Sequence, residues 1–227
     1  MHQWIRFGWL VISLASITNN AQAGIVVGGT RVIYEGGKKE ASISVTNPQK
    51  SIPYLIQSWV EVDSDSSNVK APFIITPPLF RLDPGQENIL RIVNINGQLP
   101  TDKESVYWLN IKSIPSSERS DNNTLQISVK TRIKLFYRPA GLQGEANLAY
   151  KTLKFTISKN KLSINNPSPY YVSFYNVKIG ASEINDPGMV APYGTHSLTV
   201  PTGVDGIISW QAINDYGGIS EPTRMAP

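Results

Sequence analysis

Catalytic chemistry requires a nucleophile, a base or a metal-binding cluster, and this sequence offers few candidates for any of them. Two Ser-x-x-Lys segments occur, at residues 67–70 and 158–161. Neither begins a predicted helix, and the companion motifs of penicillin-binding enzymes are missing. Residues 63–67 begin like a calcium loop, but the glycine at position six is absent and Ile74 stands where a ligating glutamate belongs. We interpret that segment as a solvated loop.

The chain has no cysteine, and His196 is its only histidine after residue 2. Thiol catalysis, thiolate metal sites and disulfides are therefore excluded. A Ser-His-Asp triad at His196 needs partners that the sequence does not display. We interpret His196 as a surface histidine at the start of a strand, and we predict a protein that is not an enzyme and uses no metal or other cofactor.

The most informative segment is residues 125–137. Its first half alternates, with Leu125, Ile127 and Val129 on one face of a predicted strand and polar residues on the other. At about 3.3 Å per residue the segment would span roughly 40 Å, although strands usually contain five or six residues. Its apolar face either covers its own domain's core or is offered to a partner. Two cations, Arg132 and Lys134, follow on the same segment.

The elements that position these residues are short strands separated by Gly- and Pro-containing turns. This pattern is typical of an all-β sandwich or barrel. The predicted strands are residues 41–45, 54–60, 73–76, 89–93, 106–111, 125–137, 153–157, 162–164, 170–177, 196–200 and 207–212.

A Pro/Gly-containing stretch at residues 138–141 separates two sets of strands. We therefore predict one domain over residues 24–143 and a second over residues 144–227. Each has enough residues to bury a core without a disulfide. Two sandwiches joined by so short a connection should meet in a cleft.

Residues 1–23 have the three parts of a secretory signal peptide: an early cation, Arg6, an apolar run over residues 7–17, and an Ala-x-Ala exit at residues 21–23. The apolar run is too short to span a bilayer. We predict export and cleavage before Gly24, with no membrane insertion. The net charge of +4 is scattered along the chain, without the concentrated basic stripe of a nucleic-acid-binding protein.

Five further segments occur in order along the chain: Thr30-Arg31-Val32-Ile33-Tyr34, Thr76-Pro77-Pro78-Leu79-Phe80-Arg81-Leu82, Lys134-Leu135-Phe136-Tyr137-Arg138-Pro139-Ala140, Asn166-Pro167-Ser168-Pro169-Tyr170-Tyr171 and Ile213-Asn214-Asp215-Tyr216-Gly217. Together they resemble the signature segments of the PapD-like periplasmic pilus chaperones, over about residues 24–218. The short stretch at residues 116–123 and the missing cysteines are similar to the family's short-loop branch.

The resemblance implies two immunoglobulin-like β-sandwich domains in a boomerang arrangement with a cleft between them. It also implies a periplasmic chaperone that binds, folds and caps pilus subunits by donor-strand complementation, without ATP. The subunits would then be delivered to an outer-membrane usher for assembly of the fimbria.

By the same resemblance, Arg31 and Lys134 would hold the C-terminal carboxylate of a pilus subunit. The donated face would be Leu125, Ile127 and Val129. Since Val129 and Lys134 are five residues apart, a flat strand would point them to opposite faces, unless twist or a bulge turns them.

Three further residues, Glu104, Arg138 and Asp215, match a family charge network that fixes the relative orientation of the two domains. Two alternatives remain at the level of sequence. An aromatic-lined groove would favour a surface adhesin or carbohydrate-binding protein, and a catalytic pocket around His196 would favour an enzyme.

Overall fold

The computed structural model describes residues 24–62, 70–95, 99–117 and 125–225. The predicted signal peptide, the calcium-like segment and most of the 116–123 stretch lie outside the described residues. The predicted all-β fold of two sandwiches is confirmed, and the one described helix is the 3₁₀ turn η1 (Ala146–Thr152).

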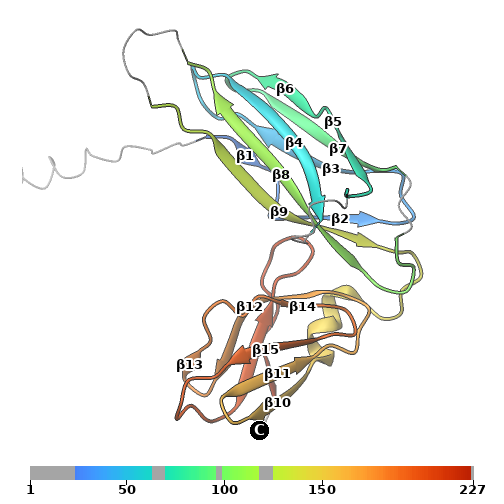
Figure 1. Cartoon of the computed structure of the whole chain (residues 1–227), viewed down its shortest axis with the longest axis vertical. Coiled ribbons are helices and arrows are strands. Elements are labelled where there is room, and N and C mark those ends of the chain that lie inside the picture. The colour runs from blue at the N-terminus through green and yellow to red at the C-terminus, as the bar shows by residue number, and fades with distance from the viewer. Residues whose placement is uncertain (1–23, 63–69, 96–98, 118–124, 226–227) are drawn as a thin grey trace, which may run out of the picture.

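The first sandwich consists of two sheets packed face to face (Figure 1). One sheet has the order β2 (Arg31–Glu35), β9 (Val129–Arg138), β8 (Ser105–Pro115), β4 (Tyr54–Val62) and β6 (Leu79–Leu82). The other has the order β1 (Val26–Val27), β3 (Ala41–Thr46), β7 (Glu87–Asn94) and β5 (Phe73–Thr76). Alternate side chains of both sheets, such as Leu109 and Leu90, are buried in one common core.

The second sandwich has its own core, and its strands are shorter. One sheet is β10 (Lys154–Ser158), β11 (Lys161–Asn165) and β15 (Thr195–Thr199). The other is β13 (Ser182–Glu183), β12 (Val172–Ile179), β16 (Ile208–Ala212) and β17 (Thr223–Met225), with β14 (Met189–Val190) paired to β12. The turn η1 closes this core, because Trp210 packs on Phe155 and donates from Nε1 to the carbonyl of Tyr150 at 2.9 Å.

The first strand of the chain changes sheets. Val26 pairs with Thr46 of β3 in one sheet, whereas Arg31 lies in parallel register with Lys134 of β9 in the other. At the crossing, the N–H of Gly28 donates to the carbonyl of Ser44, and a Cβ on Gly28 would clash with Ser44 Oγ. A glycine thus allows the close approach where the chain leaves β3.

The long predicted strand is shorter than expected, because β9 begins at Val129 and not at Leu125. Its ladder with β8 ends at the pair Ser113–Val129, next to Pro115, which has no N–H to donate. The carbonyl of Pro115 instead accepts from the side chain of Gln126 at 2.6 Å. Residues 125–128 therefore extend beyond the sheet.

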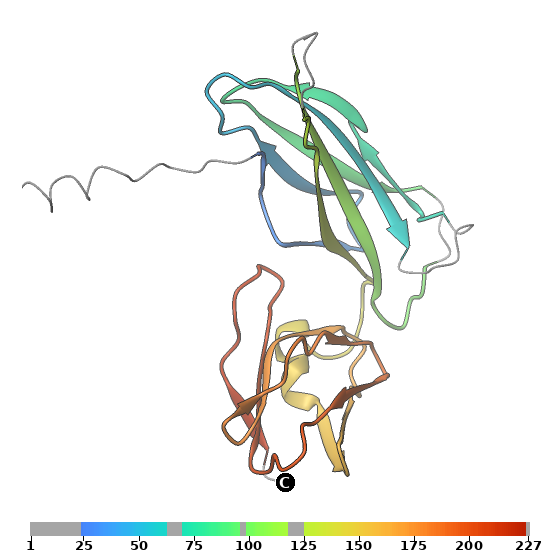
Figure 2. The same ribbon diagram turned by 60° about the vertical axis from the view of Figure 1, so that its left-hand side comes forward.

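The two sandwiches lie end to end at an angle, and the loop between β16 and β17 reaches up to β2 and β9 (Figures 1 and 2). This loop holds Asp215 and Tyr216, which line a groove of about 720 Å³ together with Arg31 and Arg138 of the first sandwich. The predicted meeting of the domains in a cleft thus has a defined place, at the lower end of β9.

Candidate functional site

Strand β9 has an open edge over its upper half. On one side β8 pairs with it from Val129 to Tyr137 without a register shift, and on the other side β2 pairs only from Lys134 to Arg138. In the described parts of the chain, no strand occupies that second side beside residues 129–133. The main-chain N–H and C=O groups of this edge are accessible to another polypeptide.

The apolar row at the upper end of β9 points away from the core. Leu125, Ile127 and Val129 are 88%, 66% and 53% exposed, whereas Ile133 and Leu135 on the same side of the strand are buried. The alternative that this face covers its own core therefore applies only to the lower half. A row of exposed large apolar side chains beside an open strand edge is typical of a surface that a partner covers.

The two predicted anchor residues are neighbours. Arg31 of β2 and Lys134 of β9 occupy facing positions of the parallel ladder, at the point where β2 begins and the open edge ends. Arg31 Nη1 donates to the carbonyl of Ile213 at 3.1 Å, and the guanidinium lies over the ring of Phe136. The ladder thus brings two cations together at the lower end of the open edge, where they can bind an anion.

The environment of Arg31 is partly desolvated. Burial lowers the pKa of Arg31, and the charges of Asp215 and Glu104 oppose that shift. Its Nε is buried without a hydrogen-bond partner in the described structure. The described residues therefore satisfy the Arg31 guanidinium only in part.

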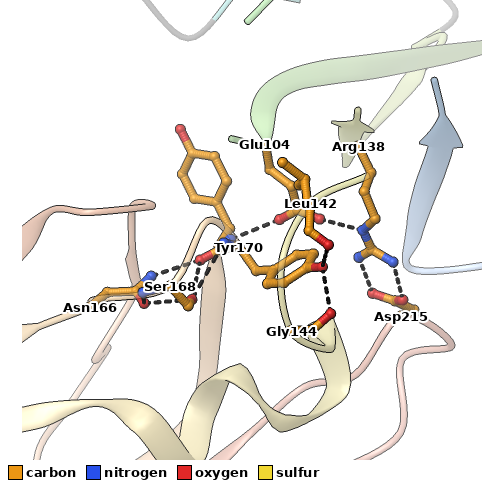
Figure 3. A network of polar contacts seen from close by, with 9 residues as sticks. Glu104, Arg138, Leu142, Gly144, Asn166, Ser168, Tyr170 and Asp215 are labelled. Atoms are coloured by element: carbon orange, nitrogen blue, oxygen red, sulfur yellow. Dashed lines mark hydrogen bonds and ion pairs between the residues drawn. The ribbon is translucent and has the colours of Figure 1, made fainter. Parts of the chain in front are cut away.

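The charge network predicted from sequence joins three segments that are distant in the chain (Figure 3). Arg138 donates from Nε to Glu104 Oε1 at 2.6 Å, and its Nη1 and Nη2 donate to the two oxygens of Asp215 at 2.7 and 2.8 Å. The other oxygen of Glu104 accepts from the N–H of Tyr171 at 2.7 Å. Both domains are therefore tied to one guanidinium.

Burial sets the protonation behaviour of this network. Glu104 is only 3% exposed, and burial raises the pKa of its carboxyl although Arg138 and the Tyr171 N–H oppose the rise. Burial opposes the charged form of Arg138 too, but the hydrogen bonds and charges of Asp215 and Glu104 raise its pKa. Arg138 thus remains a cation that pairs with both carboxylates.

One interdomain contact was not anticipated from the sequence. Gly217 has φ +83°, and a Cβ there would lie 2.6 Å from Thr30 Oγ1. The side-chain oxygen of Asn214 accepts from the N–H groups of Tyr216 and Gly218, which shapes the loop. The Asn-Asp-Tyr-Gly run in the sequence was the available signal, because Asn and Gly are the residues that tight turns favour.

The candidate catalytic residues are dispersed. His196 is half-buried in β15 with its Nε2 enclosed, so the interpretation as a surface histidine is wrong in part. Ser158 ends β10 and Lys161 begins β11, which makes that Ser-x-x-Lys segment a hairpin turn. Within the described residues, no three His, Cys, Asp or Glu side chains gather as metal ligands, and no helix has the length and hydropathy to cross a membrane.

Comparison with known families finds two matching models that together cover most of the chain. Residues 24–143 match the pili and flagellar-assembly chaperone PapD N-terminal domain, and residues 148–224 match the pili assembly chaperone PapD C-terminal domain. A probable fimbrial chaperone LpfB of Escherichia coli O157:H7 is 48% identical over 220 residues, which cover 95% of this chain and 94% of that protein. The chaperone protein FimC of Escherichia coli K12 is 40% identical over 217 residues, with 94% and 88% covered.

Solved structures give the same grouping. The chain is similar to the Salmonella enterica SafA pilin in complex with the SafB chaperone, with a TM-score of 0.83 and 36% identity over 92% of this chain and 99% of that one. The periplasmic chaperone SfaE superposes with a TM-score of 0.77 and 39% identity, with 88% and 98% covered.

Proposed function

This chain belongs to the PapD-like family of pilus-assembly chaperones, and we propose that it caps pilus subunits by lending them the open edge of β9. The observation that carries the proposal is the coincidence of that free edge with the exposed row Leu125, Ile127 and Val129. A subunit that lacks one strand of its own sandwich gains ladder hydrogen bonds from the edge and fills its open core with the row. Burial of the three side chains contributes roughly 5–9 kcal/mol before ordering costs.

The anchor residues determine the direction of the bound strand. If the subunit's terminal carboxylate contacts Arg31 and Lys134, the preceding residues extend along β9 toward Val129. The bound strand then runs parallel to β9, in line with β2, which is also parallel to β9. The bound strand would end with its carboxylate at the point where β2 begins, so binding of the carboxylate in the cleft fixes the register of the added strand.

The opposite faces of Val129 and Lys134 agree with this arrangement. The β8–β9 ladder has no bulge between these residues, so Val129 shares a face with Ile133 and Lys134 lies on the other. Both faces of an edge strand are accessible to a strand added beside it. The anchor and the apolar row can therefore act on the same bound strand from its two sides.

The domain division and the charge network complete the proposal. Domains over residues 24–143 and 144–227 are supported by the two separate cores. The contacts among Glu104, Arg138 and Asp215 support a role in fixing the domain orientation, so that the second domain closes one side of the cleft.

The chaperone acts in the periplasm, without ATP and without catalysing a reaction, and it passes its subunits to an outer-membrane usher. The signal-like residues 1–23 and the kinship with periplasmic fimbrial chaperones support this assignment. The adhesin alternative would be favoured by an aromatic-lined groove. The 720 Å³ groove in the described chain is lined by charged, small and aliphatic side chains, with Tyr216 as its one aromatic residue.

The test is co-expression in a periplasm with candidate pilus subunits, followed by pull-down with the wild type and with Lys134→Ala. Lys154→Ala, which removes an exposed cation of the second domain, is the matched control. The proposal predicts a stoichiometric complex that survives in the control and is lost in Lys134→Ala. Failure of the wild type to retain any subunit would contradict the chaperone function.

A further inference from the structure

Tyr216 is almost completely exposed, although it lies in the loop through which the second domain contacts the first (Figures 1 and 2). Its exposed fraction is 98%, compared with 88% for Leu125 beside the open edge of β9. Tyrosine carries a large apolar ring, and rings of this size are usually buried in part. Full exposure of the ring within a domain interface therefore requires an explanation.

The backbone of this loop is fixed by its own hydrogen bonds. Asn214 donates from its N–H to the carbonyl of Gly218 at 2.8 Å, and its carbonyl accepts from the N–H of Gly217 at 3.0 Å. The side-chain oxygen of Asn214 accepts from the N–H of Tyr216 at 3.0 Å and from that of Gly218 at 2.8 Å. A loop that is already ordered loses little conformational entropy when a partner binds to it.

The neighbours of Tyr216 in the loop are held against the first domain. Asp215 accepts two hydrogen bonds from Arg138, at 2.7 and 2.8 Å. Gly217 lies so close to Thr30 that an added Cβ would be 2.6 Å from the threonine hydroxyl oxygen. The residues on both sides of Tyr216 thus fix its position, whereas its own side chain is directed to solvent.

The position of Tyr216 is continuous with the proposed carboxylate anchor. Arg31 donates to the carbonyl of Ile213 at 3.1 Å, three residues before Tyr216 in the same loop. Arg31 and Tyr216 also line the same groove of about 720 Å³, which runs between β2 and β3. Ile33 and the half-exposed Ile89 contribute to the wall of this groove. A subunit whose terminus is bound at Arg31 therefore lies next to an aromatic ring and to aliphatic side chains.

We propose that Tyr216 is a preformed contact for the pilus subunit, and that its ring packs on an apolar side chain of the subunit beside the anchored terminus. The inference rests on the proposed strand addition and assigns a binding role to the second domain as well. Tyrosine is enriched among the residues that dominate binding at protein interfaces, because it covers a large area at a small cost in side-chain entropy.

The first test is a competition for the pilus subunit recovered in the pull-down described above. Wild-type and variant chaperones with different tags are co-expressed in one periplasm with a limiting amount of that subunit. Tyr216→Ala should capture about tenfold less subunit than the wild type, whereas Tyr216→Phe, which keeps the ring, should compete equally. Tyr175→Ala removes an exposed tyrosine of β12 and is the matched control, which should also compete equally. Tyr216→Ala should keep the wild-type urea midpoint, because its side chain is exposed.

The second test reports proximity and is independent of affinity. The chain contains no cysteine, so Tyr216→Cys introduces a single thiol whose reaction with a maleimide measures its accessibility. Mass spectrometry of the chaperone should show a reaction about fivefold slower in the purified complex than in the free protein, because a contact residue is shielded from solvent. The thiol of Tyr175→Cys should react at the same rate in both.

The outcomes separate this contact from the proposed function. Full capture by Tyr216→Ala, or equal reactivity of the thiol at position 216 with and without the subunit, would overturn the contact and leave strand addition standing. A loss in Tyr216→Phe as large as that in Tyr216→Ala would assign the effect to the hydroxyl and overturn the apolar packing. Failure of the wild type to retain any subunit would overturn both.

Discussion

Arg31 lies beside Lys134 in a parallel ladder, and the same arginine donates to the carbonyl of Ile213 in the other domain. One of the two cations thus belongs both to the cleft and to the domain interface, whereas the other belongs to β9. This difference allows ligand binding and domain docking to be separated by experiment.

Replacing Arg31 or Lys134 by alanine should abolish subunit capture in both cases, but the effects on stability should differ. Arg31→Ala leaves the Ile213 carbonyl without its donor and should lower the free energy of unfolding by about 1–3 kcal/mol. Lys134→Ala should lower it by less than about 1 kcal/mol. Urea denaturation measures both, and equal losses would show that Arg31 has no structural role of its own.

Glutamate at Leu125, Ile127 or Val129 should prevent subunit capture and change the free energy of unfolding by no more than about 0.5 kcal/mol, because these side chains are already exposed. The contrasting variant is Ile133→Glu, which places a charge in the core and should prevent folding. Pull-down and thermal melting measure the two effects. A loss of stability in Val129→Glu with capture intact would assign this face to the chaperone's own core.

Arg138→Leu should destabilise the chain by about 3–5 kcal/mol, because it leaves the buried carboxylate of Glu104 without its cation. The double variant Arg138→Leu/Glu104→Leu should recover part of that loss. Asp215→Asn weakens the link between the domains without leaving a buried charge, so small-angle X-ray scattering should show a broader distribution of sizes at nearly unchanged stability. An unaltered scattering curve for Asp215→Asn would argue against an orienting role of the network.

The titration of Glu104 should make stability depend on pH in a defined direction. Since burial raises its pKa above the ordinary 4.5, the folded state holds this proton more tightly than the unfolded state. The resulting stabilisation is present below pH 4.5 and is lost as the pH rises through the folded-state pKa. Relative to Glu104→Gln, which does not titrate, the wild type should therefore lose stability as the pH rises above 4.5, by at most about 1.4 kcal/mol per pH unit. A constant or rising difference in urea denaturation would contradict this.

Gly217→Ala should lower the free energy of unfolding by about 1–3 kcal/mol, through both its positive φ and the clash with Thr30 Oγ1. Thr30→Ala removes the clashing oxygen, so the double variant should regain the steric part. The remaining loss of about 1 kcal/mol then measures the backbone strain. Strict additivity of the two substitutions would mean that these residues do not touch.

The alternation of apolar and polar residues and the spacing of the turns predicted an all-β sandwich or barrel from the sequence alone, because the two-residue period of a strand is a local property. The choice of two sandwiches came from the resemblance to a family. The apolar row at Leu125, Ile127 and Val129 was visible in the same way, but only the structure shows that it is exposed. The match of several motifs to a chaperone family identified the function and named the anchor and network residues.

Tertiary structure alone decided where the strand edge is open. The edge is open because β2 pairs with β9 only from Arg31 onward, and these two strands are about a hundred residues apart in the sequence. The ladder between β8 and β9 ends near Pro115, which has no N–H to donate. The convergence of Glu104, Arg138 and Asp215 also depends on contacts between residues that are far apart in the sequence. Local patterns fix which face of a strand is apolar, but only the pairing of strands fixes which charges become neighbours and which backbone groups are left for a partner.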